Sequence, residues 1–219
     1  MNTPTVIYEH PGFAALYKPS GVLMHAVRGK APDAVPTVAE WARARYPEIS
    51  SVGDDPAVRP GIVHRLDRET SGVLVVARTR LAASKLAAAF RQRATRKIYW
   101  AVVAGVPHPK AGTIKTGMVK APGHGARGEG EKMINIHPRE IDDTPGAKRA
   151  VTEYMVIEAA AKRAAWMALN PVTGRTHQLR AHMAELGHPI AGDGKYGGSG
   201  QDNLGDGWGA QLGGDISRK

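Results

Sequence analysis

The 219-residue chain contains no cysteine, and this absence excludes several kinds of chemistry. Without a thiol the protein can form no disulfide, no thiolate nucleophile and no cysteine-ligated zinc or iron–sulfur site. The sequence also lacks an apolar run of about 18 residues, the length at which a membrane-spanning helix is expected. Its N-terminal stretch is not a basic segment followed by an apolar one, so we expect no signal peptide. These features agree with a cytoplasmic protein that makes no membrane contacts.

Acidic residues are also few, since 20 Asp and Glu face 30 Lys and Arg, which gives a net charge of +10 and a pI near 10. This imbalance indicates a polyanionic partner. Between Arg59 and Lys97, ten basic residues are opposed only by Asp67 and Glu69, which leaves a local net charge of +8. We expect this region to contact phosphate groups. An anionic membrane surface fits less well, because the helix expected there is rich in alanine and lacks a large apolar face.

One stretch in that basic region is the most informative part of the chain. Residues 64–72 read HRLDRETSG, in which Asp67 lies between Arg65 and Arg68 and a polar turn follows. The apolar run at residues 73–77 then indicates a buried strand. Nearby positive charge favours an ionised carboxylate, so we expect Asp67 to attack or orient an electron-poor centre rather than to donate a proton. The alternative is an ordinary surface acid in a solvated turn.

A second segment combines positive charge with an aromatic ring. Residues 95–101 read TRKIYWA and place Tyr99 after the basic pair Arg96 and Lys97, where an apolar strand is expected to begin. An aromatic ring beside positive charge can stack on a nucleobase, typically for about 1–3 kcal/mol per base. The alternative is that Tyr99 is a residue of the core.

A third segment joins a turn to a helix. Residues 170–180 read NPVTGRTHQLR, so that Pro171 and Gly174 indicate a turn and Arg175 lies near the start of a helix. A cation is unfavourable at the positive end of a helix dipole, and a paired carboxylate would compensate for this. The alternative is a solvated or phosphate-binding arginine.

The remaining pattern predicts the fold class. We expect strands near residues 6–9, 13–17, 73–77, 98–105, 151–158 and 164–169, with an extended hairpin or loop at 113–133. Helices are expected at 37–46, behind a capping box of Thr37 and Glu40, and at 79–93 and 176–186. This order predicts an α+β fold with a mixed, mostly antiparallel central sheet flanked by helices and loops. We assign residues 1–197 to one catalytic domain and the glycine-rich residues 198–219 to a loop segment.

Together these segments resemble the motifs of the RluA-type pseudouridine synthases. The resemblance covers about residues 6–197 and rests on five stretches of this chain, which read KPSG (18–21), HRLDRETSG (64–72), KIY (97–99), TGRTHQLR (173–180) and GHPIAGDGKYG (187–197). It implies the pseudouridine synthase fold. It also implies an enzyme, without a cofactor, that isomerises uridine to pseudouridine in structured rRNA or tRNA.

The resemblance further implies roles for single residues. Asp67 corresponds to the catalytic aspartate, Tyr99 to the ring that packs on the target uracil, and Arg175 to the arginine that pairs with the aspartate. Arg65 would help to fill the space that the flipped nucleotide leaves. Further RNA contacts are expected from other polar residues of these motifs, namely His64, Arg68, Arg96, Lys97 and Arg180. We expect the motifs at 18–21 and 187–197 to be mainly architectural.

Two other patterns indicate no site of their own. GHGARG at residues 123–128 satisfies GxGxxG, but no buried strand precedes it and no apolar helix follows, so we expect a basic loop rather than a dinucleotide site. His177 and His182 are five positions apart, which places them about 140° apart around a helix. We therefore expect these two histidines and His188 to be surface, capping or RNA-contacting residues, and we expect no metal site.

Two other functions remain open at this level. One is a catalytically inactive RNA-binding module on the same fold, and the other is a nucleotide-dependent transferase or oxidoreductase that uses the glycine-rich loop. Many members of the family carry an N-terminal S4-type domain, and we expect this chain to be the short form without it. In relatives an apolar strand would follow a stretch like residues 215–219, so we expect a truncated chain or a sheet that lacks a strand. We expect a monomer.

Overall fold

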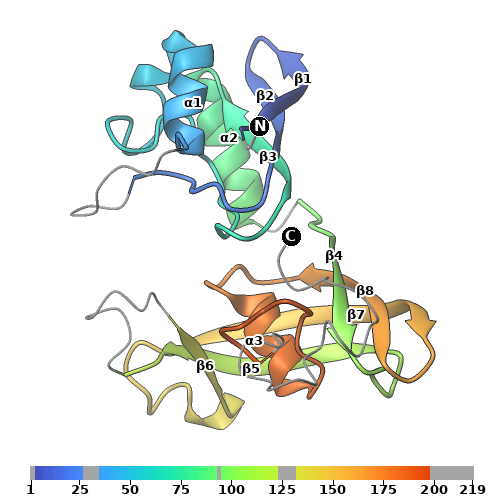
Figure 1. Ribbon diagram of the computed structural model, residues 1–219. Helices are drawn as coiled ribbons and strands as arrows, with labels where there is room; N and C mark the ends of the chain where they lie inside the picture. The colour runs from blue at the N-terminus through green and yellow to red at the C-terminus, as the bar shows by residue number, and fades with distance from the viewer. Residues whose placement is uncertain (1–2, 27–34, 93–94, 123–131, 198–219) are drawn as a thin grey trace. The chain divides into compact units, whose positions relative to one another are not determined.

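The computed structural model describes residues 3–26, 35–92, 95–122 and 132–197, and the chain divides into two compact units, Met1–Thr95 and Arg96–Lys219 (Figure 1). Every strand pair in the two described sheets is antiparallel, and three α-helices accompany them, which confirms the predicted α+β class. The described strands form two sheets, one per unit, rather than one central sheet. The sequence pattern predicts strands but does not show which strands pair with each other. The assignment of residues 1–197 to one catalytic domain stays a prediction.

The first unit is built on a three-stranded sheet in the order β1-β2-β3, with β1 at Thr5–His10, β2 at Phe13–Lys18 and β3 at Gly72–Ala77. Two α-helices belong to this unit, α1 at Val38–Arg45 and α2 at Arg80–Arg91, and a 3₁₀ turn follows α1 at Pro47–Ser51. The strands expected near residues 6–9 and 13–17 are confirmed, and they pair as an antiparallel hairpin.

Local capping signals located both helices of the first unit correctly. The Thr37 hydroxyl accepts from the Glu40 backbone N–H at 3.2 Å, and the Glu40 carboxylate accepts from the Thr37 backbone N–H at 2.8 Å. The Thr79 hydroxyl accepts from the Ala82 backbone N–H at 3.2 Å. Such bonds satisfy donors that the first turn of a helix leaves without a partner, so the sequence marks the start of the helix.

The second unit contains a five-stranded sheet in the order β4-β8-β7-β5-β6. The strands are β4 Tyr99–Ala104, β5 Ala111–Lys120, β6 Met133–Ile136, β7 Lys148–Ala160 and β8 Ala164–Pro171, with a 3₁₀ turn at Pro138–Glu140. The pairing of β5 with β6 confirms the hairpin expected over residues 113–133. The helix α3, Gln178–Glu185, packs against one face of this sheet (Figure 1).

The apolar face of α3 includes Leu179 and Met183, which are four residues apart. Met183 is fully buried in a cluster with Val103, Met167 and Leu169, and Leu179 packs against the same cluster. Residues four apart on a helix share a face, so this pattern places α3 against the sheet. The core of the second unit therefore lies between α3 and strands β4, β7 and β8.

His182 corrects one expectation, because it is fully buried rather than on the surface. Its ring nitrogens lie 2.9 and 2.8 Å from the hydroxyl oxygens of Thr116 and Thr152. Burial lowers the pKa of His182 to about 4, so the ring is neutral at pH 7, with one donor and one acceptor nitrogen. The expectation was wrong because residue type alone does not show that distant strands offer matching hydroxyls.

Two stretches that carried expectations lie outside the described residues, the GHGARG segment at 123–128 and the C-terminal segment at 198–219. Within the described ranges, no helix is long and apolar enough to cross a membrane. In the same ranges, no group of three or more His, Asp or Glu side chains is arranged to hold a metal ion.

Candidate active site

Asp67 lies in the loop that leads into β3. Leu66, which is 6% exposed, anchors this loop in the core of the first unit, and Asp67 beside it is half-buried. The loop turns sharply, because the Thr70 backbone N–H donates to the Asp67 carbonyl at 3.1 Å. Gly72 then begins β3 with a φ of +132°, a conformation that glycine adopts without strain. A short turn that is fixed at both ends therefore carries Asp67.

Lys18, which we did not predict as a site residue, holds this turn from the inside. Its side chain is fully buried at the end of β2. The ammonium group donates to the backbone carbonyls of Arg68 at 2.9 Å, Thr70 at 2.8 Å and Pro19 at 3.0 Å. An ammonium has three N–H donors, so these three acceptors use all of them. Lys18 thus links the end of β2 to the part of the turn that follows Asp67.

The charge of Lys18 matters as well as its hydrogen bonds. Burial lowers its pKa to about 8, and the carboxylates of Glu69 and Asp67 partly oppose this shift. Lys18 is therefore mostly charged at pH 7 and attracts the Asp67 carboxylate. A sequence signal exists for this residue, because strand alternation places it on the same buried face as Ala14 and Leu16.

The rest of the KPSG motif adds three hydrogen bonds to the same turn. The Gly21 backbone N–H donates to the Arg68 carbonyl at 2.9 Å, and the Ser20 hydroxyl donates to the Glu69 carbonyl at 2.8 Å. Arg68 returns a bond from its Nε to the Gly21 carbonyl at 3.1 Å, while half of its side chain stays exposed. The motif at 18–21 is thus architectural, as expected, and what it supports is the Asp67 turn.

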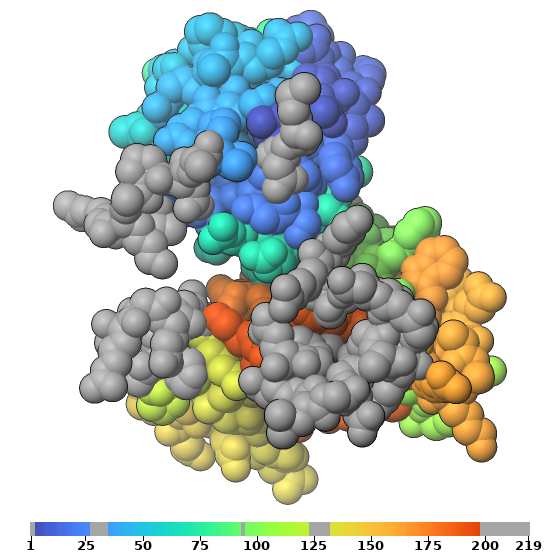
Figure 2. Space-filling view, in the orientation of Figure 1, coloured from blue at the N-terminus to red at the C-terminus, as the bar shows by residue number. Residues whose placement is uncertain are grey.

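His64 and Arg65 lie differently in the same motif. The His64 Nε2 accepts from the Val75 backbone N–H at 2.9 Å, and its ring stacks on Phe90 with 4.3 Å between centroids. This geometry favours a structural role for His64, which joins the loop to β3 and α2. Arg65 is exposed. Figure 2 shows the surface of the first unit, on which atoms coloured teal, the colour of residues near 70, are visible. An exposed arginine beside Asp67 suits the role that the motif implies.

The second unit brings two of the sequence motifs together. Tyr99 opens β4, pairs with Leu169 of β8 and packs against the core cluster beneath α3, while Trp100 points to the other face and is 69% exposed. Lys97 lies just before β4, and its Nζ would be 3.8 Å from a Cβ placed on Gly174. Because β8 runs directly into the turn around Gly174, the Lys97–Tyr99 segment and that turn share one end of the β4–β8 pair.

Arg175 lies in this turn, three residues before the start of α3. Its Nε donates to the Arg149 carbonyl at 3.0 Å, and its backbone N–H donates to the Gln178 side-chain oxygen at 3.0 Å. The helix begins slightly later than predicted, because His177 takes the N-cap position with a φ of +52°. The pairing of Arg175 with Asp67 stays a prediction.

Arg180 and Arg96 differ as candidates for RNA contact. Two guanidinium nitrogens of Arg180 donate to the Asp193 carboxylate at 2.7 and 2.8 Å, and the cation lies 5.1 Å from the centroid of the Tyr196 ring. This bidentate pair favours a structural role, in which Arg180 ties α3 to the GHPIAGDGKYG segment. Arg96 is exposed at the start of the second unit and is available to a phosphate.

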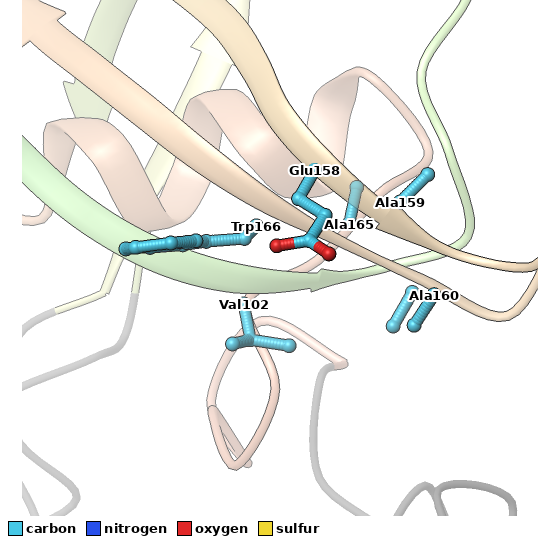
Figure 3. Close-up of a pocket in the computed structure, with 7 residues that line it drawn as sticks. Val102, Glu158, Ala159, Ala160, Ala165 and Trp166 are labelled. Atoms are coloured by element: carbon cyan, nitrogen blue, oxygen red, sulfur yellow. The ribbon is translucent and has the colours of Figure 1, made fainter.

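A shallow pocket in the second unit involves none of these residues. Strands β4, β7 and β8 line it through Val102, Glu158 and Trp166, with alanines around them (Figure 3). Val102 and Glu158 are the cross-strand neighbours of Trp166, so the pocket lies over one row of the sheet. Since Glu158 is its one charged residue, the pocket is poorly suited to an anionic nucleotide.

Most of the motifs described above fall within the match of this chain to a known family of proteins. The sequence profile described as RNA pseudouridylate synthase matches residues 12–185, a span that includes the Asp67 turn, the Tyr99 strand and the Arg175 turn. The chain therefore belongs to the RNA pseudouridylate synthase family.

Particular relatives sharpen this assignment. The chain is 35% identical over 199 residues to an uncharacterized RNA pseudouridine synthase of Synechocystis sp., covering 91% of this chain and 56% of that protein. It is 36% identical over 191 residues to the dual-specificity RNA pseudouridine synthase RluA of Escherichia coli K12, covering 87% of this chain and 76% of RluA. The chain thus spans little more than half the length of several relatives that it matches, the Synechocystis protein among them.

Solved structures agree with the family assignment. The human RNA pseudouridylate synthase domain containing 4 protein superposes with a TM-score of 0.64 at 27% sequence identity, covering 88% of this chain and 68% of the human one. The predicted pseudouridine synthase fold is confirmed by this likeness.

Proposed function

We propose that this protein isomerises uridine to pseudouridine in RNA, with Asp67 as the catalytic aspartate. This chain belongs to the family, and one observation of its structure supports the proposal most. The half-buried Asp67 lies on a turn whose backbone is held by the fully buried Lys18. A turn fixed in this way keeps its carboxylate in place without the reorganisation that a mobile loop would require.

The reaction needs a nucleotide outside its helical stack. Enzymes that act on a base commonly flip it out, because a stacked base is inaccessible. In the proposed reaction Asp67 initiates cleavage of the bond between N1 of uracil and C1′ of ribose. The base then turns, C5 bonds to C1′ and releases its hydrogen as a proton, and N1, which has lost its bond to ribose, takes up a proton. Reactant and product are isomers, so no oxidant or external group is required and we propose no cofactor.

The other motif residues receive roles in this proposal. Tyr99 would pack on the flipped uracil, Arg175 would pair with Asp67, and Arg65 would occupy the space that the base vacates. The exposed cations Arg68 and Arg96 and the half-buried Lys97 would contact phosphates, in keeping with the net charge of +10. We propose structured rRNA or tRNA as the substrate, and a monomer acting in the cytoplasm.

The test is the release of tritium from RNA labelled at C5 of uracil, because C5 loses its hydrogen only when it becomes the carbon bound to ribose. Transcripts of tRNA and rRNA would be incubated with the wild type and with Asp67→Asn. We expect release by the wild type and a rate lower by about 10³-fold or more for Asp67→Asn, with RNA affinity nearly unchanged.

The matched control is Asp54→Asn, which removes an exposed carboxylate of the same unit and should retain wild-type turnover. Substantial turnover by Asp67→Asn would remove Asp67 from the chemistry. RNA binding without release by any variant would instead favour an inactive RNA-binding module and overturn the proposed reaction.

A further inference from the structure

A connected set of polar side chains, all buried except the half-buried Asn135, runs through the second unit beneath the Arg175 turn. Its members come from three strands, the turn and α3, and they are Thr116, Asn135, Thr152, Thr173, Gln178 and His182. Among the described residues, no buried side-chain nitrogen or oxygen lacks a hydrogen-bond partner. Polar groups are costly to bury unless they are all paired, so a fully paired set fixes one arrangement of the elements that it joins.

Gln178 is the member of this set that reaches the backbone of Arg175. Its side-chain oxygen accepts from the Thr173 hydroxyl at 2.6 Å and from the Arg175 backbone N–H at 3.0 Å. Its side-chain nitrogen donates to the Val151 carbonyl at 2.9 Å and to the Thr152 hydroxyl at 3.0 Å. An amide offers two acceptor and two donor positions, so all four are used.

The orientation of this amide is determined by its partners. A flipped amide would direct its NH₂ group at the Arg175 N–H, which can only donate, and its oxygen at the Val151 carbonyl, which can only accept. The amide is 3% exposed, so water cannot take the place of a lost partner. The arrangement is therefore specific to glutamine at position 178.

The same bonds set the distance between the turn and the sheet. Thr173 also accepts from the Val151 backbone N–H at 2.9 Å, so both Thr173 and Gln178 tie the turn to one residue of β7. The N-cap residue of α3, His177, makes no side-chain cap of its own. Gln178, the first residue of the helix, instead satisfies a backbone N–H that precedes the N-cap residue, that of Arg175.

We propose that Gln178 is a positioning residue for Arg175, which holds the Arg175 peptide against β7 and so sets where its guanidinium lies during the reaction. The effect on rate rests on the proposed function, whereas the effect on the turn does not. A displacement of a catalytic contact by about 1 Å can lower a rate by roughly 100-fold, so a loosened turn should be visible in turnover.

The key variant is Gln178→Met, which keeps the length of the side chain and removes its four hydrogen bonds. Thr116→Val is the matched control, because it removes a hydroxyl from the far end of the same buried set without touching the Arg175 turn. Both variants should lose stability. The Gln178→Met variant alone should loosen the turn.

The first readout is amide hydrogen exchange at Arg175, measured by NMR and independent of activity. We expect exchange to be at least about 10-fold faster in Gln178→Met than in the wild type, and unchanged in Thr116→Val, because only the former frees this N–H. Equal exchange in all three proteins would overturn the proposal.

The second readout is the single-turnover rate of tritium release in a double-mutant cycle with Arg175→Lys. We expect Gln178→Met to lower the rate by roughly 10–100-fold when it is introduced into the wild type. Introduced into the Arg175→Lys variant, it should lower the rate by less than about 3-fold, and RNA affinity should be unchanged in both. A loss of the same size in both backgrounds, or a similar loss for Thr116→Val, would show a purely structural role. Absence of release by the wild type would overturn the proposed reaction and the effect on rate, while exchange would still report whether Gln178 holds Arg175.

Discussion

Each unit of this protein holds one motif loop from the inside with a buried side chain, but the two side chains differ in charge. In the first unit the ammonium of Lys18 binds the carbonyls of Arg68 and Thr70 around Asp67. In the second unit the neutral amide of Gln178 binds the backbone N–H of Arg175. The loop with the acid is held by a cation, and the loop with the arginine is held by a group without charge.

This difference follows from the charge that each loop carries. A buried cation is costly to desolvate, which explains why burial lowers the pKa of Lys18 to about 8, but beside Asp67 and Glu69 it gains attraction in return. A cation in the place of Gln178 would meet the Arg175 backbone N–H, which can only donate, and would find no carboxylate among the partners of the amide. The neutral amide gives the second loop fixed geometry at no electrostatic cost, so we expect the two loops to respond differently to substitution and to pH.

The largest effect is expected from Lys18→Met, which removes the charged anchor and keeps the length of the side chain. Three backbone carbonyls lose a charge-assisted hydrogen bond, and relief of the buried charge offsets only part of this loss. We expect the free energy of unfolding to fall by about 2–4 kcal/mol and turnover to fall with it, because the Asp67 turn loosens. Urea denaturation followed by circular dichroism measures the first quantity, and tritium release the second.

Lys85→Met is the control for that change, since Lys85 is an exposed lysine on α2 in the same unit. Its effect on stability should stay within about 0.5 kcal/mol, as is usual for surface substitutions. Similar losses in free energy of unfolding for Lys18→Met and Lys85→Met would mean that the buried ammonium does not hold the Asp67 turn. The contrast between a charged and a neutral anchor would then be wrong.

The sequence predicted those parts of the fold that depend on neighbouring residues. The capping box of Thr37 and Glu40 and the cap at Thr79 involve partners three residues apart, so they are visible in the sequence itself. The apolar face of α3 is similarly visible through the spacing of Leu179 and Met183.

The parts of the site that could not be predicted depend on partners far apart in the chain. Lys18 meets acceptors 50 and 52 positions away, and His182 meets a hydroxyl 66 positions away. Strand alternation shows that Lys18 faces inward, but no local pattern shows what it will meet. His64 and Arg180 match motif positions expected to contact RNA, yet their geometry favours structural roles that only the folded chain reveals.

The next largest effect concerns pH. It distinguishes the buried polar set of the second unit, which includes Gln178 and His182 and carries no charge, from the charged Lys18 of the first unit. Burial lowers the pKa of His182 from the ordinary value of 6.5 to about 4, so the unfolded chain binds a proton in a range where the folded one does not. Stability should therefore fall as the pH falls from about 6.5 to 4, by roughly 2 kcal/mol at pH 4.5, and level off below. Lys18 stays charged throughout this range and should contribute no such slope.

The measurement is urea denaturation at pH 7.0 and 4.5 for the wild type and for His182→Gln, which does not titrate. Carboxylates contribute to both proteins alike, so the difference between the two isolates the histidine. We expect the advantage of the wild type over His182→Gln to shrink by roughly 2 kcal/mol on acidification. A constant difference would mean that His182 is not buried as a neutral ring.

The smallest effects concern the hydroxyl that assists each anchor, and they sharpen the comparison most directly. Ser20 donates one bond to the Glu69 carbonyl at an exposed position, whereas Thr173 is buried, donates to Gln178 and accepts from Val151.

We expect Ser20→Ala to cost less than about 0.5 kcal/mol, because water replaces the hydroxyl and Lys18 still holds the turn. Thr173→Val should cost about 1–2 kcal/mol, because it leaves the part-buried Val151 N–H without the hydroxyl and removes a bond that orients the Gln178 amide. Urea denaturation of both variants measures the loss in free energy of unfolding. Equal losses would show that a loop held by the charged Lys18 depends on its assisting hydroxyl as much as a loop held by the neutral Gln178.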